Sequence, residues 1–185
     1  TILKPDAPWK DVDRVCQEAV DHGMASACIP PRFVKPAKEK YGNRLTVCTV
    51  IGFPLGYNTT RVKVFEAQEA VREGADEIDM VIHIGDAKAG NFDRVTEEIR
   101  AVKAACGGKI LKVIIETCLL TDEEKAALCA CVTEAGADYI KTSTGMSTAG
   151  ATPQDIELFK RHIGPEVKIK AAGGIRTREA IEGYI

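Results

Sequence analysis

The stretch YIKTSTG, residues 139–145, joins the residue types of a buried β-strand to a glycine turn and carries a lysine in its middle. It follows Gly136, which ends a helical pattern that opens with the capping box TDEE at 121–124. Helix, glycine, short apolar strand and polar loop form a unit that recurs along the chain. The lysine needs an explanation, because burying an unpaired charge costs several kcal/mol.

The same unit predicts five further strands and about seven helices in all. Asp6 is the expected N-cap of the first helix, which should stop at Gly23. Strands that alternate with helices at intervals of about thirty residues predict βαβ units and a parallel sheet. The further strand segments are ASACIP (25–30), RLTVCTVIGF (44–53), DEIDMVI (76–82), KILKVIIE (109–116) and VKIKAAGG (167–174).

Two α/β folds fit this rhythm, the doubly wound sheet and the (β/α)8 TIM barrel. The glycine-rich G-x-G-x-x-G turn of dinucleotide-binding sheets is absent from the sequence. Polar residues at the ends of several strands favour the barrel, whose active sites lie there. The count is two strands short of eight. We therefore expect residues 1–185 to form a single barrel domain truncated at both ends, with the first and last strands missing or incomplete.

Composition limits the class of protein. The chain has 185 residues, 45% of them hydrophobic, and a formal net charge of −2. These values predict one globular domain and give no basic surface for nucleic acid or membrane. The N-terminal stretch TILKPDAPWK shows no signal-peptide pattern, so we expect an intracellular, cytoplasmic protein. The three histidines lack ligand spacing, so we expect no metal. The seven cysteines lie in apolar runs, which predicts reduced core thiols, and Cys48 is expected to be inert packing.

Four of the expected strands carry charges, although parallel strands covered on both faces normally read as near-continuous Val, Ile and Leu. Period-two alternation places these charges on one face of each strand. If those faces point into the barrel, acids and lysines meet in one interior, either as a structural layer of salt bridges or as an active site. The residues that share these faces are Glu77 and Asp79, Lys112 and Glu116, Tyr139, Lys141 and Ser143, and Lys168 and Lys170.

Lys141 and Lys170 lie near the ends of adjacent expected strands, so their ammonium groups could lie within a few ångströms. Desolvation or a neighbouring cation lowers the pKa of a lysine and exposes the amine that forms a Schiff base with a carbonyl. Asp79 is the candidate carboxylate for moving protons in the later steps. The alternative for Lys141 is an ordinary strand-end lysine that reaches solvent.

Two other interior lysines are assigned structural roles. Lys112 either belongs to the polar interior layer or contacts Asp79. Lys168 faces the same way as Lys170 but one layer deeper, so we expect it to pair with Glu77.

A candidate phosphate site follows the last strand. In AAGGIRT, residues 171–177, Gly173 and Gly174 leave a strand and Thr177 opens a helix, so backbone N–H groups can face an anion beside Arg176. Barrels commonly bind phosphate with the loops after strands seven and eight. Gly145 is a second candidate, and an ordinary glycine turn is the alternative.

The segments TVCTVIGFPLG, GADEIDMVI, LKVIIET, GADYIKTSTG and VKIKAAGGIRT resemble deoxyribose-phosphate aldolase, a class I aldolase family on a (β/α)8 barrel. The resemblance runs along nearly the whole chain. It implies reversible cleavage of 2-deoxy-D-ribose 5-phosphate into D-glyceraldehyde 3-phosphate and acetaldehyde, with no cofactor and with a homodimer as a candidate assembly. It implies that Lys141 forms the Schiff base, that Lys170 perturbs its pKa and that Asp79 relays protons. Gly173, Gly174 and Arg176 match the phosphate-binding segment.

The sequence also departs from the family. It lacks the Asp-His-Thr type strand ahead of LKPDA and the GASRIGTS-like strand that completes the barrel. Two other functions therefore stay open. One is a barrel that isomerises or cyclises sugar phosphates by acid/base chemistry at Asp79 and Glu116, and the other is a non-catalytic barrel remnant.

Overall fold

A computed structural model describes residues 1–184. Its strands form one parallel sheet in sequential order, and each strand pairs with the next along the chain. A doubly wound sheet reverses its strand order part-way, so the sequential order selects the barrel that the sequence predicts. The strands are β1 (Ala27–Cys28), β2 (Val47–Ile51), β3 (Glu77–Val81), β4 (Ile110–Ile114), β5 (Tyr139–Lys141) and β6 (Lys168–Lys170).

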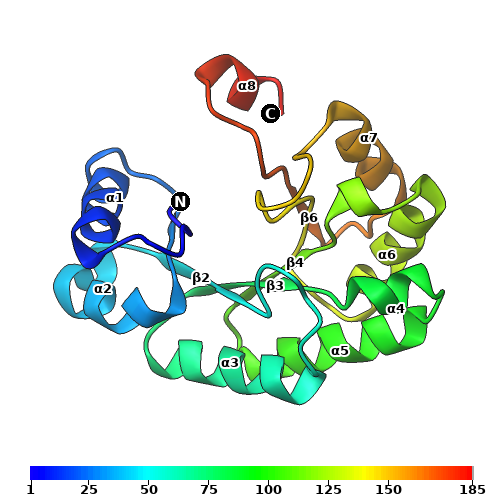
Figure 1. The fold of residues 1–185 in the computed structure, drawn as a ribbon, viewed down its shortest axis with the longest axis horizontal. Coiled ribbons are helices and arrows are strands. Elements are labelled where there is room, and N and C mark those ends of the chain that lie inside the picture. The colour runs from blue at the N-terminus through cyan, green and yellow to red at the C-terminus, as the bar shows by residue number, and fades with distance from the viewer. Residues whose placement is uncertain (185) are drawn as a thin grey trace.

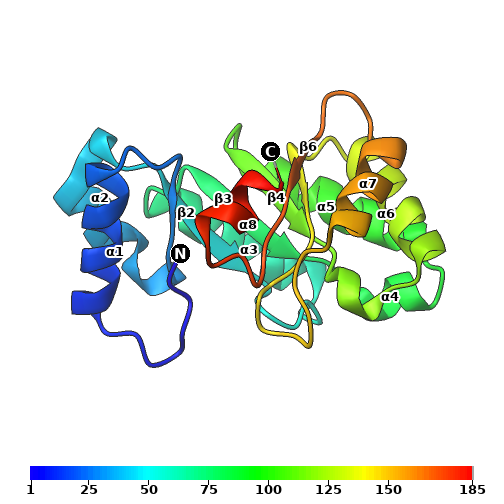
Figure 2. The same ribbon diagram turned by 90° about the horizontal axis from the view of Figure 1, so that it is seen from above.

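The sheet is curled, with helices along its outer side, and the N-terminal segment and the segment after β6 lie on its open side (Figure 1). The backbone N–H of Ile2 donates to the carbonyl of Cys28 at 3.0 Å. Residues ahead of the first helix therefore lie beside β1, where the sequence predicts the end of a preceding strand. Figures 1 and 2 both place helix α8 (Arg178–Glu182) between two pairs of helices. One pair is α1 (Trp9–Asp21) and α2 (Val34–Tyr41), and the other is α6 (Asp122–Glu134) and α7 (Pro153–His162).

Most helices begin at the capping residues from which the sequence predicts a helix start. Thr121 and Glu124 form the expected capping box, and the side chains of Thr152 and Thr177 cap the two later helices. No helix within residues 1–184 combines the length and apolarity needed to cross a bilayer. The helices are α1 (Trp9–Asp21), α2 (Val34–Tyr41), α3 (Thr60–Arg72), α4 (Ile84–Lys88), α5 (Phe92–Ala105), α6 (Asp122–Glu134), α7 (Pro153–His162) and α8 (Arg178–Glu182), and the 3-10 turns are η1 (Pro31–Phe33), η2 (Gly42–Arg44) and η3 (Thr117–Leu119).

Two helix predictions differ from the structure. The first helix has Pro8 as its N-cap, so the assignment of Asp6 to that position is wrong. The start of a helix tolerates a proline, because its ring fixes φ at a value that suits a helix start and its missing N–H would have no partner there. The short α4 was not predicted, since five residues are too few to show a helical period.

The strands separate two environments. Ile78 and Met80 on β3 are fully buried and face the helices as part of the main hydrophobic core. On the concave side, Cys48 and Val50 of β2 form a separate small apolar cluster with Cys28. Because side chains alternate along a strand, the charged residues between the core positions face the concave side.

Candidate active site

Asp79 on β3 is the centre of a buried charge cluster. Its side chain is fully buried, and Lys141 Nζ donates to its Oδ2 at 2.5 Å. Lys112 Nζ donates to the other oxygen, Oδ1, at 2.9 Å and to Glu77 Oε2 at 2.6 Å. Lys112 therefore belongs to the interior layer and also contacts Asp79. Such pairing is the condition under which ionised groups persist in a protein interior.

The strand register brings these residues together. Asp79 is the register partner of Lys112 on β4, and Lys141 is the partner of Lys170 on β6. The expected placement of Lys141 and Lys170 at the ends of adjacent strands is therefore confirmed. Lys141 reaches Asp79 across the intervening β4, over two strand spacings of about 4.8 Å each, because the lysine stem is long and the curl of the sheet brings side chains of β3 and β5 together on its concave face.

The charges shift the pKa values of both partners. Burial raises the pKa of Asp79, but the charges of Lys141 and Lys112 outweigh burial and hold that pKa at about 2. Burial lowers the pKa of Lys141, but the Asp79 carboxylate and the nearby Cys28 and Cys48 together outweigh burial and leave the pKa above its ordinary value. The expected lowering of the Lys141 pKa is not present in this arrangement, because several raising interactions add up against burial.

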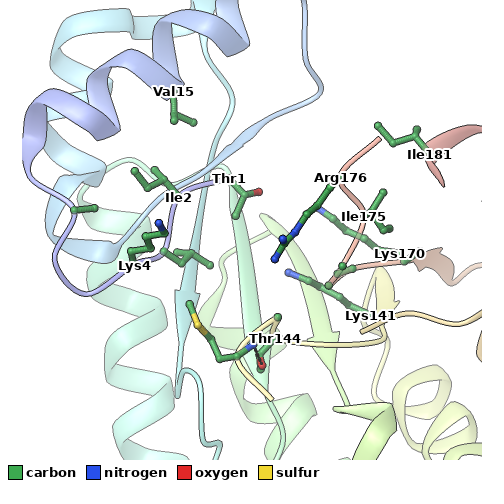
Figure 3. A pocket seen from close by; sticks show the side chains of 18 of the residues that line it. Thr1, Ile2, Lys4, Val15, Lys141, Thr144, Lys170, Ile175, Arg176 and Ile181 are labelled. Carbon is green, nitrogen blue, oxygen red and sulfur yellow. Dashed lines mark hydrogen bonds between the residues drawn. The ribbon is translucent and has the colours of Figure 1, made fainter. Parts of the chain in front are cut away.

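A cavity of about 1010 Å³ lies over this cluster. Lys141, Lys170 and Arg176 point into it from one side, and the segment that holds Thr1 and Lys4 lines the other (Figure 3). Gly145, Gly173 and Gly174 line the same cavity. The candidate nucleophile and the candidate phosphate residues thus share one space.

The glycines allow the loops after β5 and β6 to approach closely. Gly173 has φ +84°, and a Cβ built on it would lie 2.9 Å from the Cα of Gly150. The N–H of Ala151 donates to the carbonyl of Ala172 at 2.9 Å across the same contact. Because only glycine fits such a contact, close packing of the backbone requires glycine at these positions, whether or not a ligand binds there.

Comparison with known protein sequences identifies the family of this chain. The sequence model described as DeoC/LacD family aldolase matches residues 1–184. The chain belongs to this family. It is 57% identical over 185 residues to a deoxyribose-phosphate aldolase from Clostridium botulinum, covering all of this chain and 84% of that protein. The corresponding protein of Clostridioides difficile is 54% identical with the same coverage.

Solved structures of this family share the fold. The tetrameric deoxyribose phosphate aldolase from Aeropyrum pernix superposes with a TM-score of 0.89 at 34% identity. The match covers 98% of this chain and 78% of that one. A further structure, the aldolase QR15, gives a TM-score of 0.94 at 39% identity and covers 99% of this chain and 82% of its own. The DeoC fold is a TIM barrel, and the six parallel strands are part of it.

Glu116 in the loop after β4 and Ser143 in the loop after β5 have surroundings that the sequence did not predict. Glu116 is buried at φ +57°, and it accepts hydrogen bonds from the N–H and hydroxyl of Thr144. It therefore holds the loop that follows Lys141 and does not join the Asp79 cluster. Ser143 Oγ is buried and has no hydrogen-bond partner within residues 1–184. Buried hydroxyls are usually satisfied, so this one is available to a substrate or water.

Lys168 has a different role from the one expected. Glu77 is paired with Lys112 and with the hydroxyl of Ser26 at 2.8 Å. Lys168 is exposed, and its Nζ lies 5.7 Å from the centre of the Tyr139 ring. The predicted Lys168–Glu77 pair is wrong, because β6 places Lys168 at the solvent-facing end of the strand while Glu77 is closer to the lysine of the neighbouring β4.

Proposed function

We propose that this chain is a class I aldolase that reversibly cleaves 2-deoxy-D-ribose 5-phosphate into D-glyceraldehyde 3-phosphate and acetaldehyde through a Schiff base on Lys141. The observation that carries the proposal is the Lys141 amine at the edge of a large cavity, 2.5 Å from the buried carboxylate of Asp79. The names of the relatives support the choice of substrate.

The first step requires a free amine on Lys141. Its ammonium proton lies on a hydrogen bond to Asp79 Oδ2, so that carboxylate is the acceptor in place. Lys112 stays on Oδ1 and keeps Asp79 oriented with Oδ2 toward Lys141. As positive charge develops on the nitrogen that attacks the substrate C1 carbonyl, the ammonium group of Lys170 on the next strand favours its loss of a proton.

Carbon–carbon cleavage then follows from the iminium ion. The hydroxyl on C3 loses its proton, the C2–C3 bond breaks, and the electron pair moves toward the iminium to give an enamine. Glyceraldehyde 3-phosphate leaves with C3, C4 and C5. Protonation of the enamine at C2 and hydrolysis release acetaldehyde and return the amine of Lys141, and Asp79 is the group in reach to move these protons.

The phosphate group of the substrate fits the region of the cavity that Arg176 and three glycines line. Gly145, Gly173 and Gly174 have positive φ values and line this region with Arg176. Backbone N–H groups freed by such turns, together with a guanidinium group, are the donors that bind phosphate. We assign these four residues to phosphate binding.

A homodimer is the assembly we propose. Three large apolar side chains, Leu55, Tyr57 and Phe65, are more than half exposed around the start of α3. Sedimentation of the full-length protein tests this proposal, because Phe65→Glu should shift the mass toward the monomer and an unchanged mass would remove α3 from the interface.

The decisive experiment incubates the full-length protein with acetaldehyde and borohydride and maps the adduct by mass spectrometry. We expect a reduced ethyl group on Lys141. Because trypsin does not cleave after the modified lysine, the adduct should appear on a peptide that spans residues 126–160. Lys141→Ala should abolish it, and Lys170→Ala should weaken it.

Lys168→Ala is the matched control, since Lys168 lies two residues before Lys170 on the same strand but is exposed. It should leave the adduct unchanged. A folded protein that gives no adduct would exclude the Schiff-base mechanism and favour acid/base chemistry. That alternative is weaker, because Glu116, its second acid, is occupied by Thr144.

A further inference from the structure

Two cysteines lie beside Asp79 in the interior and take no part in the proposed reaction. Cys28 on β1 and Cys48 on β2 are register partners on neighbouring parallel strands. Both are free thiols, and their exposed fractions are 4% and 0%. Their sulfur atoms and a carboxylate oxygen of Asp79 all lie within 4.8 Å of one another.

The hydrogen bonds of this cluster make the two thiols unequal. Cys48 Sγ donates to Asp79 Oδ1 at 3.2 Å, and Lys112 Nζ lies 3.4 Å from the same sulfur. The contact with the Cys48 thiol lowers the pKa of Cys28, whereas the same contact and burial raise the pKa of Cys48 well above its ordinary value. Since the thiolate is the reactive form, Cys28 is the nucleophile of the pair.

The surrounding charges decide which reagent suits the pair. Two thiols and a carboxylate are ligands for a soft metal ion, but both oxygens of Asp79 already accept from ammonium groups. A divalent cation would have to approach Lys112, Lys141 and the nearby Lys170 against their charge. A small neutral oxidant meets no such barrier.

We propose that Cys28 and Cys48 form an oxidation site, a dithiol that hydrogen peroxide converts into a disulfide inside the barrel. The Cys28 thiolate attacks one peroxide oxygen, the O–O bond breaks, and the other oxygen leaves as water after taking a proton. The sulfur of Cys48 then attacks the resulting sulfenic acid, the S–S bond forms, and a second water leaves. Two thiols are oxidised, and both peroxide oxygens are reduced.

Strand geometry permits this bond. Neighbouring strands lie about 4.8 Å apart, and the Cα atoms of disulfides are usually about 4.4 to 6.8 Å apart. The register of Cys28 and Cys48 therefore falls within reach without a change of strand pairing. The bond removes the S–H group that donates to Asp79, so we expect acetaldehyde trapping at Lys141 to slow about tenfold, a change that a thiol reductant reverses.

The test treats the full-length protein with hydrogen peroxide and analyses tryptic peptides without reduction. A Cys118→Ser background removes the one half-buried thiol among residues 1–184. We expect peptide 15–32 joined to peptide 45–61, with two hydrogen atoms fewer than their sum. Cys16 shares the first peptide, so fragment ions must place the bond at Cys28.

Cys28→Ser and Cys48→Ser are the matched controls, and each should lose the joined peptide. A disulfide bond through Cys16 overturns the proposal. Treated protein that yields no joined peptide also overturns it, and this includes protein in which oxidation stops at a sulfinic acid on Cys28. The joined peptide is read by mass alone, so the result does not depend on Schiff-base formation at Lys141.

Discussion

Replacing Asp79 with asparagine separates the electrostatic role of this residue from its role in proton transfer. The substitution keeps the side-chain shape but removes the charge that pairs with Lys141 at 2.5 Å and Lys112 at 2.9 Å. A unit charge about 4 Å from another contributes about 4 kcal/mol at an effective dielectric constant of about 20, a value that also describes buried sites. Divided by 1.36 kcal/mol per pKa unit, this lowers the pKa of Lys141 by about three units.

The assay is the pH dependence of acetaldehyde trapping at Lys141 by borohydride. The midpoint of adduct formation in Asp79→Asn should lie about three units below that of the unmodified protein. Steady-state cleavage should nevertheless fall, because the amine is more available but the proton acceptor is lost. Glu134→Gln is the matched control, since Glu134 pairs with Arg100 on the exposed surface. A midpoint that stays in place or rises would refute the electrostatic reasoning.

The same variant has a predicted stability signature. Removing one partner of a buried pair costs about 3 to 5 kcal/mol at neutral pH. In the variant the folded-state pKa of Lys141 lies below its unfolded value, so the folded state binds fewer protons and stability rises with pH. Denaturant titrations should show the deficit shrinking from about pH 7 toward about pH 10. A deficit that grows over that range would contradict this sign.

Three further predictions concern other parts of the molecule. Glu98→Leu removes the salt-bridge partner of the fully buried Lys63. Urea titration should show a free energy of unfolding that is lower by about 3 to 5 kcal/mol. A loss below about 1 kcal/mol would mean that the pair is not buried in solution. Gly173→Ala places a Cβ 2.9 Å from Gly150 and should weaken binding of inorganic phosphate while leaving trapping at Lys141 measurable; unchanged phosphate affinity would move the anion site elsewhere. Because the pKa of Lys141 is raised, its trapping rate should rise about tenfold per unit between about pH 6 and about pH 9, and a plateau below neutral pH would show that the amine is already free.

Much of the fold was predictable because it depends on local pattern. Each βαβ unit is marked by a capping residue, a helical period, a glycine and a short apolar run, and all six expected strands are present. Period-two alternation also placed Asp79, Lys141 and Lys170 on the concave face. The exceptions, the start of α1 and the short α4, lie where the local signal is a single residue or a single turn.

The sequence by itself determined the order of elements, the family and the residue types of the site. Only the tertiary structure decided which lysine pairs with which acid. Lys112 forms salt bridges with both Glu77 and Asp79, and Lys168 forms one with neither. Lys141 forms a salt bridge with Asp79. Those choices depend on distances across a curled sheet, which follow from register and curvature between strands far apart in the chain. A single strand's periodicity fixes the face on which a side chain lies, but not the neighbour that it meets there.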